Sequence, residues 1–308
     1  MLAEITLLIA ATLRLGTPLI FAAMGGVLSE RAGIVNIGLE GMMLIGAFFG
    51  VLGSYLTGSA WIGLAFAITA GILVALLFAL STIRYGADQV ISGIAINLIA
   101  LGGTGYLLVR IYGSPGTTPT VTGFSTTPIP VLQNIPLIGS GLFGQSWFVW
   151  MAVLCAVVIW FFLSRTSTGL RLRASGEDPH VLEASGVAVL PIRYCAVAAS
   201  GMLCGLGGAY LSLSSLNSFS ESMTAGRGFI ALAAVIFGGW RPLRVLGAAI
   251  FFGFASALLI RVPQNVLDPQ VLFTIPYVLT IIALVVFGRS SKSPASEGVP
   301  YRPGSERI

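Results

Sequence analysis

Three long stretches of this chain contain no Asp, Glu, Lys or Arg: the residues between Glu40 and Arg84, between Arg110 and Arg165, and between Arg193 and Glu221. Charged residues make up only 9% of the chain, whereas about a quarter is typical of a soluble domain. Each stretch leaves room for one or more membrane spans of about 20 residues. Lipid offers the backbone no hydrogen-bond partners, so spanning segments fold as helices. The sequence therefore predicts an all-α, polytopic transmembrane bundle.

Apolar runs predict about nine spans, with a range of about 8–10 because glycine-rich segments can be broken or re-entrant. The expected spans are 5–24, 40–57, 61–82, 89–109, 147–164, 194–213, 224–240, 245–260 and 271–288. Residues 1–288 thus form the expected transmembrane domain. The polar, proline-containing residues 289–308 are expected to be a disordered tail. The glycine-rich run 200–215 places small residues on a helix face, which predicts close helix packing.

Basic residues indicate the orientation, because Lys and Arg collect in short cytoplasmic loops. Loop 165–193 and the tail are rich in Arg, whereas 111–146 is uncharged and 214–227 has a single basic residue. We therefore expect loop 165–193 and the C-terminus to be cytoplasmic. The N-terminus and the connectors 111–146 and 214–227, which have few basic residues, are expected to lie outside. The connector 111–146 is either an ordered loop that covers a pore or meets an external partner, or a passive link.

Several chemistries are excluded because the residues they need are scarce. The only lysine is Lys292 and the only histidine is His180, so no GxxxxGK[ST] phosphate loop, HExxH motif or His-based triad can exist. Cys155, Cys195 and Cys204 lie in apolar runs without ligand-like spacing, and we interpret them as small buried hydrophobic residues. Basic residues are dispersed over short connectors and form no nucleic-acid-binding face. No catalytic residue, metal site or cofactor is expected on this chain.

The loop sequence RLRASGEDPHVLEASGVAVLP (171–191) predicts a short helix between two spans. Asp178 is a suitable N-cap, Pro179 fits the first turn, and Gly186 is a suitable stop after residue 185. A helix of about two turns is not stable alone in water. Because both of its ends are tied to spans, it is suited to docking a partner and transmitting force; a structured loop without a partner is the alternative.

Five polar residues in apolar surroundings are candidates for a translocation path. Asn36 and Glu40 are four residues apart and would share one helix face, near glycines that interrupt the helix. Polar groups at membrane depth mark either a pathway or a structural hydrogen bond, and for these two the structural role is slightly favoured. Gln89, Ser92 and Asn97 lie near one face of the fourth span. They could line a conduit or satisfy neighbouring backbone groups.

Three segments resemble the permease subunits of bacterial ABC importers, in the branched-chain amino acid and simple-sugar permease family, and specifically its nucleoside-uptake branch. They are SERAGIVNIGLEGMMLIGAF (29–48), the loop and following helix at 174–212, and GFIALAAVIFGGWRPLRVLGAAIFFG (228–253). The resemblance covers most of residues 10–288. It implies that 177–186 is a coupling helix that docks on a cytoplasmic ATPase. The residues that it implies in coupling are Glu177, Asp178, Pro179, Glu183, Ala184 and Gly186. Of these, Glu183, Ala184 and Gly186 match the family's EAA…G pattern, and Ser185 departs from it.

The resemblance further implies half of the translocation path of an ATP-driven importer in a bacterial inner membrane. The expected solute is a nucleoside, with a simple sugar and then a branched-chain amino acid as alternatives. The implied partners are a second homologous permease, an ATPase that binds ATP and Mg²⁺, and an external substrate-binding lipoprotein. From other classes, a secondary carrier or channel would need an ion site at Glu40 or Asp88. A structural subunit that moves no solute is also open, and an intramembrane enzyme is least favoured.

Overall fold

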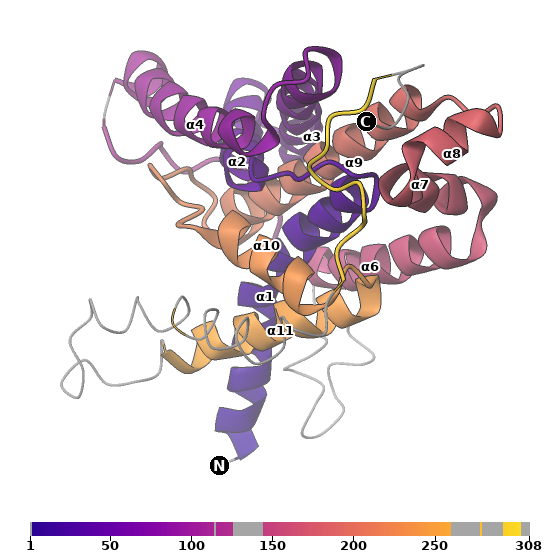
Figure 1. Ribbon diagram of the computed structural model, residues 1–308. Helices are drawn as coiled ribbons and strands as arrows, with labels where there is room; N and C mark the ends of the chain where they lie inside the picture. The colour runs from indigo at the N-terminus through magenta and orange to yellow at the C-terminus, as the bar shows by residue number, and fades with distance from the viewer. Residues whose placement is uncertain (1, 114, 126–143, 260–277, 279–291, 303–308) are drawn as a thin grey trace.

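The computed structural model describes residues 2–113, 115–125, 144–259, 278 and 292–302 (Figure 1). The regular elements of this part are helices, which confirms the all-α prediction. In chain order they are α1 (Leu2–Arg31), α2 (Leu39–Thr57), α3 (Ala60–Ala79), the π-helical turn η1 (Leu80–Arg84), α4 (Gln89–Tyr112), α6 (Trp147–Arg165), α7 (Ser167–Glu177), α8 (Pro179–Ala184), α9 (Val189–Ala209), the π-helical turn η2 (Tyr210–Ser215), α10 (Arg227–Phe237) and α11 (Pro242–Leu259).

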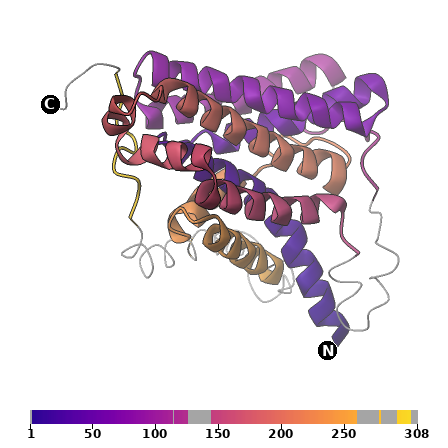
Figure 2. The same ribbon diagram turned by 90° about the vertical axis from the view of Figure 1, so that its right-hand side faces the viewer.

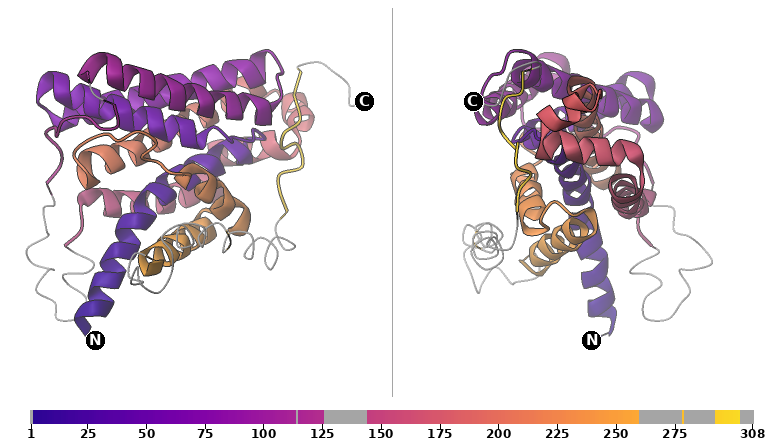
Figure 3. Two further views of the ribbon diagram at one scale, coloured as in Figure 1. Left: turned by 90° about the vertical axis from the view of Figure 1, so that its left-hand side faces the viewer. Right: turned by 45° about the vertical axis from the view of Figure 1, so that its right-hand side comes forward.

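Helix α9 lies at the centre of the bundle, in contact with α1, α2 and α3, while α4 packs on α2, and α6 and α11 pack on α1. Helix α1 crosses the other helices obliquely (Figure 3). Glycines allow the central helices to touch. A β-carbon on Gly46 would lie 2.7 Å from the α-carbon of Gly205, and one on Gly205 would lie 2.5 Å from the carbonyl oxygen of Ala67. The close packing predicted for residues 200–215 is confirmed.

Within the residues that the structure describes, six helices are long and apolar enough to cross a membrane, and they match the first six expected spans. They are Glu4–Arg31, Leu39–Thr57, Ala60–Arg84, Gln89–Tyr112, Trp147–Arg165 and Val189–Ser215. The eighth expected span, 245–260, corresponds largely to the shorter helix α11. The ninth, 271–288, lies outside the described residues apart from position 278. A polytopic bundle is therefore confirmed, and the total of about nine spans stays a prediction.

The seventh expected span, 224–240, is not a continuous helix. Only Arg227–Phe237 is helical, and 11 residues reach about 16 Å, roughly half the thickness of the hydrocarbon core. The preceding residues 216–226 form turns and bends with no helix. A hydropathy average cannot detect this break, because one apolar half-helix is enough to raise the mean of the whole window.

The bundle has two distinct ends (Figure 2). One end carries α8 and the described C-terminal residues. The other carries the N-terminus and a cluster of aromatic rings in which Trp61 stacks on Trp147, with centroids 5.6 Å apart, and Phe124 meets both edge-on. Tryptophan is enriched where membrane meets water, so this cluster marks one boundary of the hydrocarbon region.

Candidate coupling surface and translocation path

Helix α8 begins and ends where its sequence predicts, to within one residue. The Asp178 carboxylate accepts hydrogen bonds from the backbone N–H groups of His180 (3.1 Å) and Val181 (3.2 Å), which satisfies the first free donors of the helix. The helix ends at Ala184 and the chain turns at Gly186, whose φ is +83°. The predicted short helix is therefore confirmed, while its coupling role stays a prediction.

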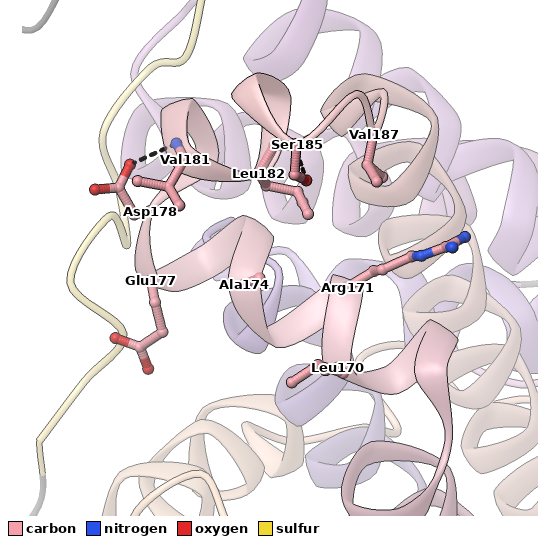
Figure 4. Close-up of a pocket in the computed structure, with 9 residues that line it drawn as sticks. All are labelled: Leu170, Arg171, Ala174, Glu177, Asp178, Val181, Leu182, Ser185 and Val187. Atoms are coloured by element: carbon pink, nitrogen blue, oxygen red, sulfur yellow. Dashed lines mark hydrogen bonds between the residues drawn. The ribbon is translucent and has the colours of Figure 1, made fainter.

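Helix α7 was not predicted, although its start has a readable signal. The Thr166 hydroxyl accepts a hydrogen bond from the Gly169 N–H (3.0 Å), and threonine is a favourable N-cap. Together α7 and α8 enclose a groove of about 470 Å³ (Figure 4). Val181 and Leu170 line it and are 66% and 58% exposed. Two exposed aliphatic side chains beside one groove, at an end of the bundle, form a surface suited to a protein partner.

The end of α7 is tightly attached to the membrane helices. The Ser175 hydroxyl donates to the Ala32 carbonyl oxygen at the end of α1 (3.1 Å), and Arg193 of α9 donates to the Ser175 carbonyl oxygen (3.0 Å). Arg193 is only 2% exposed. At Gly176 a β-carbon would collide with the Arg31 carbonyl group, so only glycine permits this approach. A displacement of α7 and α8 must therefore act directly on the ends of α1 and α9.

Residues 292–302 add a third attachment, which differs from the disorder predicted for 289–308. The Ser296 N–H donates to the Gly176 carbonyl oxygen (2.9 Å) and the Gly298 N–H to the Gly33 carbonyl oxygen (3.2 Å). Tyr301 is 8% exposed and packs with Leu182 of α8 and Val189 of α9. Composition predicts disorder because it registers few apolar residues, and it cannot register backbone bonds to distant glycines.

Tyr301 also links α8 to α9 through its polar and π-electron groups. The Arg193 guanidinium lies 5.5 Å from the centre of its ring, within cation–π range. Burial, together with the hydrogen bond and the negative charge of Glu183, raises the pKa of the Tyr301 phenol to about 12. The phenol is therefore neutral at physiological pH and acts as a hydrogen-bond donor to Glu183.

The predicted coupling residues occupy different environments. Glu177 is engaged within the chain, because its carboxylate lies 3.8 Å from Arg31 and accepts from the Ala295 N–H (3.3 Å). Pro179 is buried, Glu183 is half-buried, and Ala184 and Gly186 are exposed. The outward surface of α8 is thus formed by Val181 and residues 184–186, and Asp178 serves as the helix cap.

The polar residues expected in the path surround a break between two spans. We call residues 32–38, which join α1 to α2, the joint. Asn97 of α4 accepts from the Gly41 N–H (2.8 Å) and donates to the Ile37 carbonyl oxygen (3.1 Å), and Gln89 accepts from the Val35 N–H (2.6 Å). These bonds satisfy backbone groups that the interrupted helix leaves without intrahelical partners. Ser92 is half-buried on the same helix and takes no part in these bonds.

Asn36 closes the joint on its other side. It is fully buried, donates to the Ser200 hydroxyl of α9 (3.0 Å) and accepts from the Gly38 N–H (3.1 Å). The structural hydrogen bond that was slightly favoured for Asn36 is present. A role in the translocation path stays a prediction for all five candidates.

Glu40 connects the start of α2 to α10. Its two carboxylate oxygens accept from the Gly226 N–H (2.8 Å) and the Gly228 N–H (2.5 Å) at the first turn of α10. A carboxylate is stabilised there both by hydrogen bonding and by the positive end of the helix dipole. At Gly228 a β-carbon would collide with Glu40. Glu40 therefore fixes the N-terminus of a half-length helix inside the bundle.

Residues 216–226 are a functional candidate that the sequence does not predict, because the scarcity of charge in 214–227 indicates an outer connector. They descend beside α2: the ring centroids of Phe219 and Phe48 are 5.2 Å apart, and the Gly226 N–H donates to the Glu40 carboxylate. We call 216–237 the broken span, an irregular half followed by α10. The run of Ser, Asn and Gly between two apolar segments was the available signal.

The described helices thus form a polytopic bundle with a short surface helix, α8, and a broken span. Residues 8–287 match the family described as "Branched-chain amino acid transport system / permease component". The chain belongs to this family, so it is a transport component and not an enzyme.

Relatives with assigned names match along nearly their full length. The chain is 42% identical to "Guanosine ABC transporter permease protein NupQ" of Bacillus subtilis, over 97% of this chain and 98% of that one. It is 36% identical to "Nucleoside ABC transporter permease protein NupC" of Lactococcus lactis, over 96% of both chains. It is also 36% identical to "Putative glucose ABC transporter permease protein TsgC13" of Haloferax volcanii, over 90% of both.

A solved structure shares the fold. It is titled "An inward-facing conformation of a putative metal-chelate type ABC transporter" and matches with a TM-score of 0.51 at 17% identity, over 91% of this chain and 85% of that one.

Proposed function

We propose that this chain is the permease subunit of an ATP-driven importer of nucleosides. The main support for this proposal is the 42% identity to a relative named as a guanosine permease, along nearly the whole of both chains. A simple sugar is the second candidate solute, because a relative named for glucose is as similar as the one named for nucleosides in general. A branched-chain amino acid, which the family description names, comes third.

The proposed ATPase docks on the groove between α7 and α8. In support, Val181 and Leu170 are exposed beside it, and the segment is bonded to α1, α9 and residues 292–302. A docked ATPase that changes shape on binding ATP would move this attached segment as a unit. ATP and Mg²⁺ are bound by that partner. A second permease chain and an external binding lipoprotein complete the proposed assembly, with the α8 end in the cytoplasm of a bacterial cell.

The first experiment purifies the tagged chain from its native membrane in mild detergent and identifies its partners by mass spectrometry. We expect an ATPase and a second permease. Val181→Arg should remove the ATPase because it places a charge in the docking groove. Val299→Arg is the matched control, since Val299 is 56% exposed at the same end but does not line the groove. A stable assembly without an ATPase would contradict the proposal and favour a carrier or channel.

Glu183→Arg tests coupling itself. Because Glu183 lies on α8 and is bonded to Tyr301, we expect ATP hydrolysis to continue while nucleoside uptake falls, with membrane insertion unchanged. Normal uptake by this variant would remove Glu183 from the coupling residues.

A further inference from the structure

The irregular half of the broken span lies at the depth of the membrane helices, where lipid offers its backbone N–H and C=O groups no hydrogen-bond partners. Its neighbours on α2 run from Phe48, which meets Phe219, to Glu40, which meets Gly226, so it lies beside the middle and the first turn of a helix long enough to cross the membrane. Irregular backbone is tolerated at this depth only when it is covered by protein or borders a water-filled space. Figure 3 (left) shows this stretch running below α2 and α4.

One side of the segment is covered by the chain and the other is open. Met223 and Thr224 are buried, Thr224 being 1% exposed, whereas Glu221, Ser222, Ala225 and Phe229 are exposed. The open side therefore carries a carboxylate, a hydroxyl and an aromatic ring within about two helical turns of sequence.

Glu221 constrains what this open side can face. Its backbone N–H donates to the Gly116 carbonyl oxygen (2.8 Å), and its carboxylate lies beside Gly105 of α4, where a β-carbon would be 3.2 Å from it. Within the described part of the chain this carboxylate has no hydrogen-bond or ion-pair partner. An ionisable side chain at membrane depth turns to the bundle interior or to water, so the open side of Glu221 is not a lipid surface.

We propose that the irregular half and first turn of the broken span, residues 216–229, line the translocation path, with Glu221, Ser222 and Phe229 in contact with the solute. This inference rests on the proposed transport function and adds the contact residues to it. Glu221 accepts hydrogen bonds from hydroxyl and ring N–H groups, and Ser222 accepts or donates. Phe229, which is 46% exposed, offers its face to a planar base.

The charge arrangement favours a neutral solute. The N-terminus of α10 would attract an anion, but Glu40 already occupies its Gly226 and Gly228 N–H groups. Glu221 adds a further negative charge nearby, and the single guanidinium of residues 216–229, that of Arg227, is bonded to the Met223 and Thr224 carbonyl oxygens (2.8 and 3.2 Å). Two carboxylates thus stand against one guanidinium, which disfavours a solute with a carboxylate, such as an amino acid, whereas a nucleoside combines hydroxyl groups, N–H groups and a planar ring without net charge.

Cysteine labelling in native membrane vesicles of both orientations tests the path. The three native cysteines are first replaced, because Cys195 is exposed. A membrane-impermeant maleimide should label Ser222→Cys and Ala225→Cys about tenfold faster than Leu73→Cys, because the thiolate that reacts forms in water and not in lipid. Leu73 is a matched control, 57% exposed on the apolar face of α3, and Thr224→Cys controls for burial. Equal rates at Ala225→Cys and Leu73→Cys would overturn the proposal.

The same labelled variants test the solute. Guanosine should slow the labelling of Ser222→Cys and leave Thr224→Cys unchanged. Protection by glucose alone would overturn the nucleoside assignment, and protection by neither would overturn the solute contact. Labelling needs no ATPase, so its outcome is independent of whether the partner proposal holds.

Glu221→Gln then measures the contribution of the carboxylate. We expect the KM for guanosine uptake to rise about tenfold, as for the loss of a charge-assisted hydrogen bond, with unchanged amounts of chain in the membrane and unchanged co-purification of partners. An unchanged KM would remove Glu221 from the site.

Discussion

Asn97 shows how a single side chain stabilises a break between two spans. Its amide oxygen and nitrogen bond the Gly41 N–H and the Ile37 carbonyl oxygen, both of which would otherwise lie in an apolar environment. Asn97→Leu should lower the free energy of unfolding by about 1–3 kcal/mol for each unsatisfied group. Resistance to denaturation by SDS in detergent micelles measures the change.

Ser92→Ala is the matched control, since Ser92 lies on the same helix and takes no part in the bonds of the joint. If Asn97→Leu is as stable as Ser92→Ala and only uptake is lost, the side chain acts on the solute and not on the joint.

A second prediction at the scale of single residues concerns Tyr301. Tyr301→Ala removes a ring that packs on Leu182 and Val189 and lies near Arg193, and burial of such a ring contributes about 2 kcal/mol. Backbone amides of residues 179–187 should therefore exchange with deuterium more than about tenfold faster, as measured by mass spectrometry. Tyr301→Phe should keep most of the protection, because the phenyl ring is retained.

Val299→Ala is the control for this experiment, because its side chain is 56% exposed in the same segment. Equal exchange in Tyr301→Ala and Val299→Ala would show that residues 292–302 do not restrain α8.

At the scale of elements, the contacts among α2, α3 and α9 depend on the absence of side chains. Gly205→Leu would force apart helices whose backbones nearly touch at Gly46 and Ala67, and such overpacking costs about 1–3 kcal/mol or more. We expect the variant to aggregate at lower temperature in detergent. Gly102→Ala should be neutral, because a β-carbon there meets no atom within 4 Å. Equal thermal stability of the two variants would contradict the packing seen here.

The elements that the sequence predicts correctly are those with local causes. Helix α8 is predictable because Asp178 and Gly186 act within a few residues of its ends, and the long spans are predictable because apolar residues are continuous. The contacts of the joint are not, since the Asn97–Gly41 bond links positions 56 residues apart. The broken span was missed for a similar reason: its irregular half is held in place by Phe48 and Glu40 of α2.

The burial of the three cysteines is likewise not predictable from local sequence. All three cysteines lie in apolar runs and were interpreted as buried, but only Cys204 is, while Cys155 is half-buried and Cys195 is exposed. An apolar span has a lipid-facing side as well as a packed one, and hydropathy does not distinguish the two.

At the scale of the whole molecule, the structure and the distribution of charge favour the same orientation. Arg31, Arg193 and the described tail lie together at the α8 end, and the N-terminus lies at the opposite end (Figure 2). Because basic residues are retained in the cytoplasm, we expect the tail inside and the N-terminus outside. This also requires an odd number of membrane crossings, which agrees with nine.

Impermeant maleimide labelling of intact cells measures this orientation in a chain without its native cysteines. Ile5→Cys, 49% exposed near the N-terminus, should react in intact cells, and Lys292→Cys, exposed in the tail, should react only after permeabilisation. The reverse pattern would place the α8 groove outside the cell, where no ATP-hydrolysing partner could reach it. Reaction of both residues from one side would require an even number of crossings and would contradict the nine predicted spans.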